Sequence, residues 1–98
     1  MKVSVVICTY SLDTHEALIE SIESVRSQTY DNTEIIVVVD GSQPLYDRIA
    51  AKYDSVITLL NDENVGLSKS RNRGVERASG DIIAFLDDDA VADERWIE

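Results

Sequence analysis

The fold is decided by the stretch Ile35-Ile36-Val37-Val38-Val39, which runs directly into Asp40-Gly41-Ser42. Five consecutive branched aliphatic residues are typical of a strand covered on both faces, because such a strand has no side that needs to meet water. Similar, nearly continuous apolar runs lie on either side of it, at residues 3–7, 56–60 and 82–86. The sequence therefore predicts four buried strands.

Helical patterns separate these strands. The spacing of apolar residues predicts an amphipathic helix over 14–27, with Asp13 as its N-cap. A second helix follows the second strand, and a third spans 67–79 with Gly80 as its C-terminal cap. A further helix is expected to begin at Asp93. Strands that alternate with helices predict an α/β fold with a Rossmann-like, doubly wound and mostly parallel sheet.

Length and charge exclude several classes of protein. The chain has 98 residues, which is one domain at most, and its formal net charge is −10. Such a charge repels nucleic acid, so no nucleic-acid partner is expected, and an anionic ligand would need a metal ion, an arginine or a helix N-terminus to bind. The N-terminal apolar run has the length of a strand and lacks the cleavage site of a signal peptide. We therefore expect a cytoplasmic protein, at the cytoplasmic face of the membrane if the full-length form is membrane-associated.

Polar residues follow each of the four predicted strands. Thr9 and Tyr10 follow the first, Asp40 the second, Asn61 the third, and the run 87–89, Asp87-Asp88-Asp89, the fourth. In an open parallel sheet, ligands bind beyond the carboxyl ends of the strands. The sequence therefore predicts that these residues share one edge of the sheet.

The aspartate run is the main candidate for ligand chemistry. The first strand is followed by neither of the glycine-rich loops that cradle phosphates in NAD enzymes and P-loop NTPases. Carboxylates suit Mg²⁺ and Mn²⁺. In an extended segment Asp87 and Asp89 would share a face, and Asp88 would point away unless the backbone turns. The alternative is a solvated acidic loop.

Five segments, in chain order, resemble the motifs of glycosyltransferase family 2, whose members are inverting enzymes with the GT-A fold. Residues 3–10 resemble an opening strand that usually ends in P-T-Y-N, and residues 24–30 resemble S-x-x-x-Q-T-Y. Residues 38–42 are similar to V-D-D-G-S, and residues 64–74 to N-x-G-x-x-x-A-R-N-x-G. Residues 78–89 closely follow A-x-G-D-x-I-x-F-L-D-D-D. Each motif is weak alone, but together they cover nearly the whole chain.

The resemblance implies a donor, a metal and a set of residues. The donor would be a nucleotide-diphosphate sugar, with a UDP-sugar favoured, and the acceptor a lipid- or glycan-linked molecule. The implied substrate-binding residues are Thr9, Tyr10, Asp40, Ser42, Arg71, Asp87 and Asp88. Thr9 and Tyr10 would line the base pocket and Asp40 would hydrogen-bond the base. Asp89, together with Asp87, would hold Mn²⁺ or Mg²⁺. For Arg71 a surface ion pair with Glu76 or an acidic loop is the simpler interpretation, and for Ser42 a helix cap.

The resemblance also implies what lies elsewhere. In this family the general base is a carboxylate well beyond the aspartate motif, so it is expected beyond residue 98 and no catalytic residue is assigned here. We therefore expect the N-terminal, nucleotide-sugar-binding half of a truncated GT-A domain, which lacks the acceptor-binding half and binds without turnover. Cys8, Ser11 and Val39 depart from the family pattern, but the second Asp of its D-D-G-S is retained as Asp40.

Three alternative functions make different demands on the sequence. A binding-only, degenerate transferase module fits the same residues. A nucleotidyltransferase-like domain should carry a glycine- and lysine-rich loop near the first strand, where this chain has Cys8-Thr9-Tyr10. A receiver-type signalling domain needs acidic residues at that same place.

Overall fold

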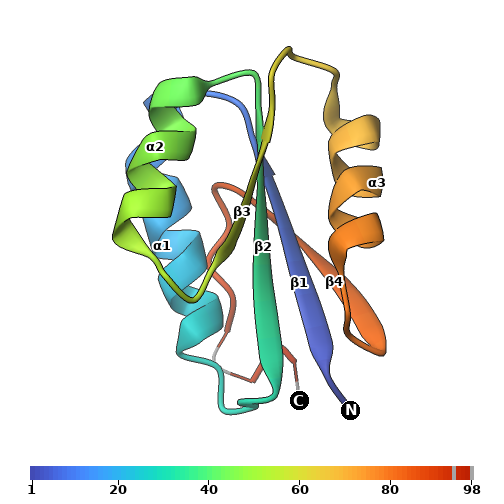
Figure 1. Cartoon of the computed structure of the whole chain (residues 1–98). Coiled ribbons are helices and arrows are strands. Elements are labelled where there is room, and N and C mark those ends of the chain that lie inside the picture. The colour runs from blue at the N-terminus through green and yellow to red at the C-terminus, as the bar shows by residue number, and fades with distance from the viewer. Residues whose placement is uncertain (94, 98) are drawn as a thin grey trace.

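The computed structural model describes residues 1–93 and 95–97 of the chain. In chain order its elements are β1 (Val3–Thr9), the 3-10 turn η1 (Leu12–Thr14), α1 (His15–Arg26), β2 (Thr33–Asp40), α2 (Gln43–Lys52), β3 (Ile57–Asn61), α3 (Leu67–Arg77) and β4 (Ile82–Asp87) (Figure 1).

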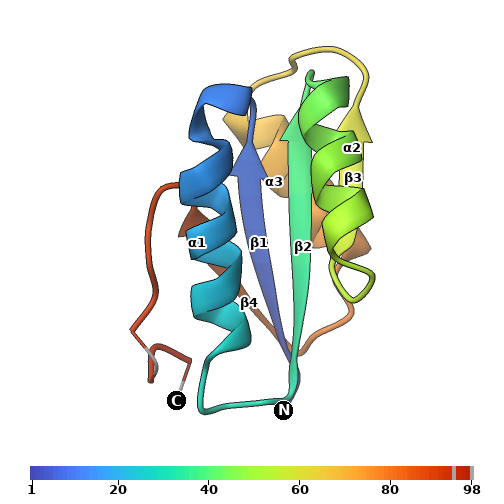
Figure 2. The same ribbon diagram turned by 90° about the vertical axis from the view of Figure 1, so that its left-hand side faces the viewer.

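The four strands form one parallel sheet in the order β3-β2-β1-β4. Helices α1 and α2 cover one face of it, and α3 covers the other (Figures 1 and 2). The chain starts in the sheet at β1 and continues outward to β2 and then to β3. Helix α3 then forms the crossover that leads to β4, which pairs with the other side of β1. This arrangement confirms the predicted doubly wound α/β fold.

The core is thicker on the side of α1 and α2. Aliphatic side chains from β1 and β2 pack there against buried residues of both helices, among them Leu18, Ile22 and Ile49. The α3 side has a smaller core around Val6 of β1. At Gly74 of α3, a Cβ atom would lie 2.5 Å from Val6 Cγ1, so the lack of a side chain at this position lets the helix lie close to the sheet. That close approach makes α3 one wall of the region above the strand ends.

Strand β4 differs from the prediction of a buried strand. It is the strand at one end of the sheet order, and Ile82 and Phe85 are each 44% exposed. The two central strands are almost entirely buried. An apolar run predicts a strand, but its burial depends on the strand's position in the sheet, which the run does not encode.

Two predicted helix caps are also wrong. Ser11, and not Asp13, caps the first helical segment, because its Oγ accepts a hydrogen bond from Asp13 N at 3.1 Å. Helix α3 ends at Arg77, and its C-cap residue is Ala78, which is already in an extended conformation. Gly80 instead serves close approach, because a Cβ atom there would lie 2.8 Å from Ser4 N.

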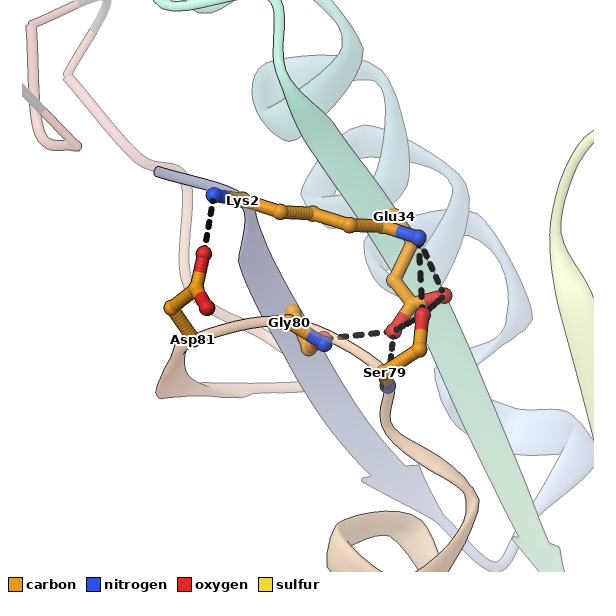
Figure 3. A network of polar contacts seen from close by, with 6 residues as sticks. Lys2, Glu34, Ser79, Gly80 and Asp81 are labelled. Carbon is orange, nitrogen blue, oxygen red and sulfur yellow. Dashed lines mark hydrogen bonds and ion pairs between the residues drawn. The ribbon is translucent and has the colours of Figure 1, made fainter.

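A polar network closes the sheet at the amino ends of β1 and β2 (Figure 3). The Glu34 carboxylate accepts hydrogen bonds from Ser4 Oγ at 2.5 Å and Ser79 N at 2.6 Å, and Lys2 Nζ lies 3.4 Å from it. Asp81 accepts from Lys2 N at 3.0 Å. Burial opposes the charge of Glu34, but these partners outweigh burial and lower its pKa to about 2. The network ties the α3–β4 loop to the start of the sheet.

The segment after β4 folds back along α1. Gln28 Nε2 donates to Asp93 O at 2.6 Å, and Gln28 Oε1 accepts from Ile97 N at 3.0 Å. The helix expected from Asp93 spans residues 94 and 98, which lie outside the described residues. Asp93 does accept a hydrogen bond from Arg95 N, at 3.0 Å. No helix in the described part of the chain is both long enough and apolar enough to span a membrane.

Candidate functional site

A cavity of about 430 Å³ lies at the carboxyl ends of β1, β2 and β4, beside the start of α3. The parallel sheet brings the ends of these strands together, as the sequence predicted. The residues that line the cavity are Val6, Cys8, Thr9, Tyr10, Asp40, Asn64, Gly66, Leu67, Ser70, Arg71, Leu86, Asp87, Asp88 and Asp89. Six of the seven predicted substrate-binding residues and both predicted metal ligands are among them.

The end of β1 supplies one side of the cavity. Thr9 is buried, and its Oγ1 lies 3.4 Å from Thr14 Oγ1. Tyr10 is 65% exposed, so its ring is available for contact with a ligand. Burial raises the pKa of the Cys8 thiol to about 11, in spite of the opposing charge of Arg71. Cys8 is therefore a neutral, weakly polar part of the wall.

Asp40 at the end of β2 is buried and holds the loop that follows β3. Its Oδ1 accepts hydrogen bonds from Asn61 Nδ2 at 3.0 Å and Val65 N at 2.8 Å, and its Oδ2 accepts from Gly66 N at 2.9 Å. Burial acts to raise the pKa of Asp40, but the three hydrogen bonds outweigh it and hold the pKa below its usual range. Asp40 is therefore an oriented carboxylate anion at the cavity wall.

Asn61 hydrogen-bonds Asp40 and is itself held by two residues of α3, Ser70 and Arg73. Asn61 Nδ2 also donates to Ser70 Oγ at 3.0 Å, and Asn61 Oδ1 accepts from Arg73 Nη1 at 2.7 Å. The sequence placed Asn61 at the same edge as Asp40 but gave it no role, and it did not single out Arg73. The signal in the sequence was only that Asn61 ends the third apolar run as Asp40 ends the second; the structure adds the register, in which Asp40 pairs with Asn61 across β2 and β3.

The aspartate run is not extended, so the predicted shared face of Asp87 and Asp89 does not arise from strand alternation. The chain turns at Asp88 and Asp89, and Ala90 N donates to Asp87 O at 3.1 Å. Alternation along a strand therefore does not apply beyond Asp87. The turn instead brings all three carboxylate residues to the cavity lining, and Thr14 Oγ1 donates to Asp88 Oδ2 at 3.4 Å.

The aspartates suit a divalent metal only as part of a shared coordination shell. Among residues 1–93 and 95–97, no group of three or more His, Cys, Asp or Glu side chains is arranged to hold a metal ion. Carboxylate oxygens are nevertheless the ligands that Mg²⁺ and Mn²⁺ prefer, and Mg²⁺ is usually bound by one or two carboxylates plus substrate phosphates. The carboxylate oxygens of Asp87 and Asp89 therefore fit a metal ion whose remaining ligands come from a bound phosphate group.

Arg71 and Ser42 have different places. Arg71 lines the cavity, and its Nη2 lies 3.8 Å from Asp87 Oδ1, so its ion pair is with the acidic run and not with Glu76. Ser42 does not line the cavity. Its Oγ caps α2 by accepting from Leu45 N at 3.4 Å, as the simpler interpretation had it.

Known proteins resemble this chain over its whole length. The glucosyl-dolichyl phosphate glucuronosyltransferase of Haloferax volcanii is 48% identical over 101 residues, which is 100% of this chain and 32% of that protein. The crystal structure of S. aureus TarS 1-349 in complex with UDP superposes with a TM-score of 0.83 at 27% identity, over 97% of this chain and 29% of that one.

A third similar protein carries both a nucleotide sugar and a metal. The mannosyltransferase PcManGT from Pyrobaculum calidifontis, in complex with GDP-Man and Mn²⁺, superposes with a TM-score of 0.71 at 26% identity, over 92% of this chain and 28% of that one. The chain thus spans about a third or less of the length of these relatives.

These structural neighbours are GT-A glycosyltransferases, and they share the parallel α/β sheet described above. The family model for glycosyl transferase family 2 matches residues 4–98, which is nearly the entire chain. The five motifs of the sequence and the superposition on TarS agree with that match. The chain belongs to glycosyl transferase family 2.

Proposed function

We propose that this chain forms the donor site of an inverting, metal-dependent glycosyltransferase, and that it binds a nucleotide-diphosphate sugar in the cavity at the strand ends. The observation that carries the proposal is the meeting of an oriented Asp40 with Asp87, Asp88 and Asp89 around one cavity in a family 2 chain. Asp40 ends β2 and the aspartate run follows β4, on either side of β1, so the cavity has a hydrogen-bond acceptor on one side and, in this proposal, the metal ligands on the other. A nucleotide diphosphate needs both, at its two ends.

The base would lie against β1 and β2. Thr9 and Tyr10 line this part of the cavity, and the exposed ring of Tyr10 offers a surface for stacking. Asp40 accepts a hydrogen bond from the base, because its carboxylate is charged and held in place. Asp88 lies nearer the ribose, between the base and the metal ligands.

The diphosphate would lie against β4. With a net charge of −10, the chain needs a cation to hold a diphosphate near three carboxylates. In the proposal Asp89 and Asp87 hold Mn²⁺ or Mg²⁺, and the Mn²⁺ complex of PcManGT supports the presence of a divalent metal. When bound, the metal neutralises charge on the departing diphosphate. Arg71 adds a positive charge at the same wall.

The identity of donor and acceptor is also proposed from the relatives. The UDP complex of TarS supports a UDP-sugar as donor, whereas the GDP-Man complex of PcManGT keeps a GDP-sugar open. The name of the Haloferax volcanii relative includes a glucosyl-dolichyl phosphate, which supports a lipid-linked sugar as acceptor. A binding-only module is the second candidate, and transfer assays on the whole protein distinguish it.

Calorimetric titration of UDP, GDP and dTDP, with and without Mn²⁺, tests the proposal. We expect UDP to bind in Mn²⁺ and to bind about tenfold more weakly when Mn²⁺ is omitted or when Asp89→Ala is introduced. The exposed Asp54 lies outside the cavity lining, so Asp54→Ala is the charge-matched control. Absence of binding by all three nucleotides would overturn the donor site. Nucleotide binding that is unchanged both by omitting Mn²⁺ and by Asp89→Ala would overturn the proposed metal site.

A further inference from the structure

The Asp40 carboxylate has one acceptor position left. Each carboxylate oxygen can accept about two hydrogen bonds. Both positions of Oδ1 are filled, by Asn61 Nδ2 and Val65 N, whereas Oδ2 accepts only from Gly66 N. No other hydrogen bond to the Asp40 carboxylate occurs within the described residues. A ligand in the cavity that donates to Asp40 must therefore donate to Oδ2.

Asn61 can take only one of its two amide orientations. Its Nδ2 group donates to Asp40 Oδ1 and to Ser70 Oγ, which uses both of its hydrogens. Rotating the amide by half a turn would place its oxygen against the Asp40 carboxylate, where two acceptors repel. Its orientation is therefore coupled to the place of Asp40.

Arg73 fixes that orientation from outside the cavity. Its Nη1 donates to Asn61 Oδ1 at 2.7 Å and also to Leu60 O. An amide rotated by half a turn would present N–H groups to this guanidinium, so two donors would face each other. Arg73 is half-buried and does not line the cavity, so it can act on a ligand only through Asn61.

We propose that Asn61 and Arg73 are positioning residues for base recognition, which together leave a single open acceptor on Asp40 Oδ2. This inference rests on the proposed function, because it assumes that a nucleotide base occupies the cavity. A fixed acceptor selects bases whose ring carries an N–H donor. Uracil, thymine and guanine carry one, whereas the corresponding ring nitrogens of cytosine and adenine are acceptors. These two bases could donate only through their exocyclic amino groups, which would require the ring to shift from the position that places a ring N–H on Oδ2. The network therefore selects against cytidine and adenosine diphosphates.

The test is the ratio of affinities for UDP and CDP, measured by calorimetry in Mn²⁺ on the 98-residue chain. We expect the wild-type chain to prefer UDP about tenfold, since a hydrogen bond to a charged acceptor gives roughly that ratio. The ratio should fall to about one to three in Asn61→Ala and Arg73→Met. Arg73→Lys should keep most of the preference, because it retains a donor for Asn61 Oδ1.

Arg77→Met is the matched control. Arg77 is exposed and lies one turn beyond Arg73 on the same helix, at the end away from the cavity, so its loss removes the same charge without a change at Asn61. A general electrostatic or stability effect would weaken UDP and CDP together in both arginine variants and leave the ratio unchanged. An unchanged ratio in both Asn61→Ala and Arg73→Met overturns the inference.

Amide hydrogen exchange separates this inference from the proposed function. Val65 and Gly66 donate their N–H groups to Asp40, so their exchange reports how firmly the carboxylate is held without any ligand. We expect faster exchange at both positions in Asn61→Ala and Arg73→Met, but not in Arg77→Met. If the wild-type chain binds no nucleotide, the proposed function and base recognition both fail. The exchange rates of Val65 and Gly66 then still test whether Asn61 and Arg73 position Asp40. Unchanged exchange in Asn61→Ala and Arg73→Met would overturn that positioning role.

Discussion

The two ends of the parallel sheet both carry acidic side chains, but they differ in how these are held. At the amino end, the Glu34 side chain is only 12% exposed and is surrounded by Ser4, Ser79 and Lys2 (Figure 3). At the carboxyl end, the Asp87 side chain is 74% exposed and has one ion pair, at 3.8 Å. At the first end, which we call the closed end, the carboxylate is enclosed by protein partners; at the second, the open end, it is left accessible.

The comparison shows what distinguishes a structural carboxylate from one available to a ligand. It is the number of unfilled acceptor positions, and not the presence of acids, that differs between the two ends. Asp40 lies between these extremes, because it holds a loop and still has one open position on Oδ2. The variants below change one carboxylate or its partner at a time, in order of decreasing expected effect.

Asp40→Ala should have the largest effect on stability. It removes the acceptor of three donors, Asn61 Nδ2, Val65 N and Gly66 N, of which only Asn61 is buried and still has Ser70 Oγ as a second acceptor. Because each hydrogen bond to a charged acceptor contributes about 1.5–3 kcal/mol and the two backbone donors can turn to water, we expect the free energy of unfolding to fall by about 3 kcal/mol in urea titrations without ligand. Asp54→Ala is the control. A loss below about 1 kcal/mol would mean that Asp40 is not part of the structural framework.

Glu34→Gln tests the closed end, and its effect should depend on pH. The folded pKa of Glu34 is about 2, below the ordinary value of 4.5. Glu34 therefore contributes its full stabilisation above pH 4.5, and this contribution is lost as the pH falls from 4.5 toward 2. At pH 7 we expect Glu34→Gln to lower the free energy of unfolding by about 2 kcal/mol. The exposed Glu20 provides the control Glu20→Gln.

The pH dependence makes this second prediction specific. The difference between wild type and Glu34→Gln should narrow steadily in urea titrations between pH 4.5 and pH 2. A difference that stays constant over this range would show that Glu34 contributes by packing and not by charge. Nucleotide binding should be unchanged at pH 7, because Glu34 lies at the other end of the sheet from the cavity.

The sequence was sufficient for the fold because four apolar runs and the helices between them leave few arrangements open. It was wrong about the burial of β4 for a physical reason. The run 82–86 is as apolar as the others, but the crossover through α3 places it at an end of the sheet order, where Phe85 is exposed. Strand order depends on how helices pack, and no single run contains that information.

For the site, the sequence predicted which residues converge but not how they are held. Asp40 and the aspartate run line one cavity because parallel strands end at one edge. The roles of Asn61 and Arg73 depend on the register of β3 and on the rotation of α3 about its axis, and neither follows from local pattern. Whether Thr9, Ser42 or Asp89 binds a ligand stays a prediction.

Asp89→Asn should change stability in the opposite direction to Glu34→Gln. Asp89 is exposed beside two other carboxylates, so neutralising it relieves repulsion. We expect the free energy of unfolding to rise by about 0.5 kcal/mol at low salt without metal. The gain should vanish in 1 M KCl, where the screening length is about 3 Å. Asp54→Asn controls for the general net charge. A destabilised Asp89→Asn variant would place Asp89 in the structural framework.

The smallest expected effect is the coupling between Arg71 and Asp87. Their charged atoms are 3.8 Å apart and their side chains are 42% and 74% exposed, so we expect a double-mutant cycle of Arg71→Met and Asp87→Asn to give about 0.3 kcal/mol. Most of the cost of Arg71→Met alone should come from Phe85, whose ring centre lies 5.4 Å below the guanidinium. A coupling above about 1 kcal/mol would show that Asp87 is held as firmly as Glu34. A weak coupling leaves Asp87 able to exchange Arg71 for a metal ion at little cost, which is what a shared metal and diphosphate site requires.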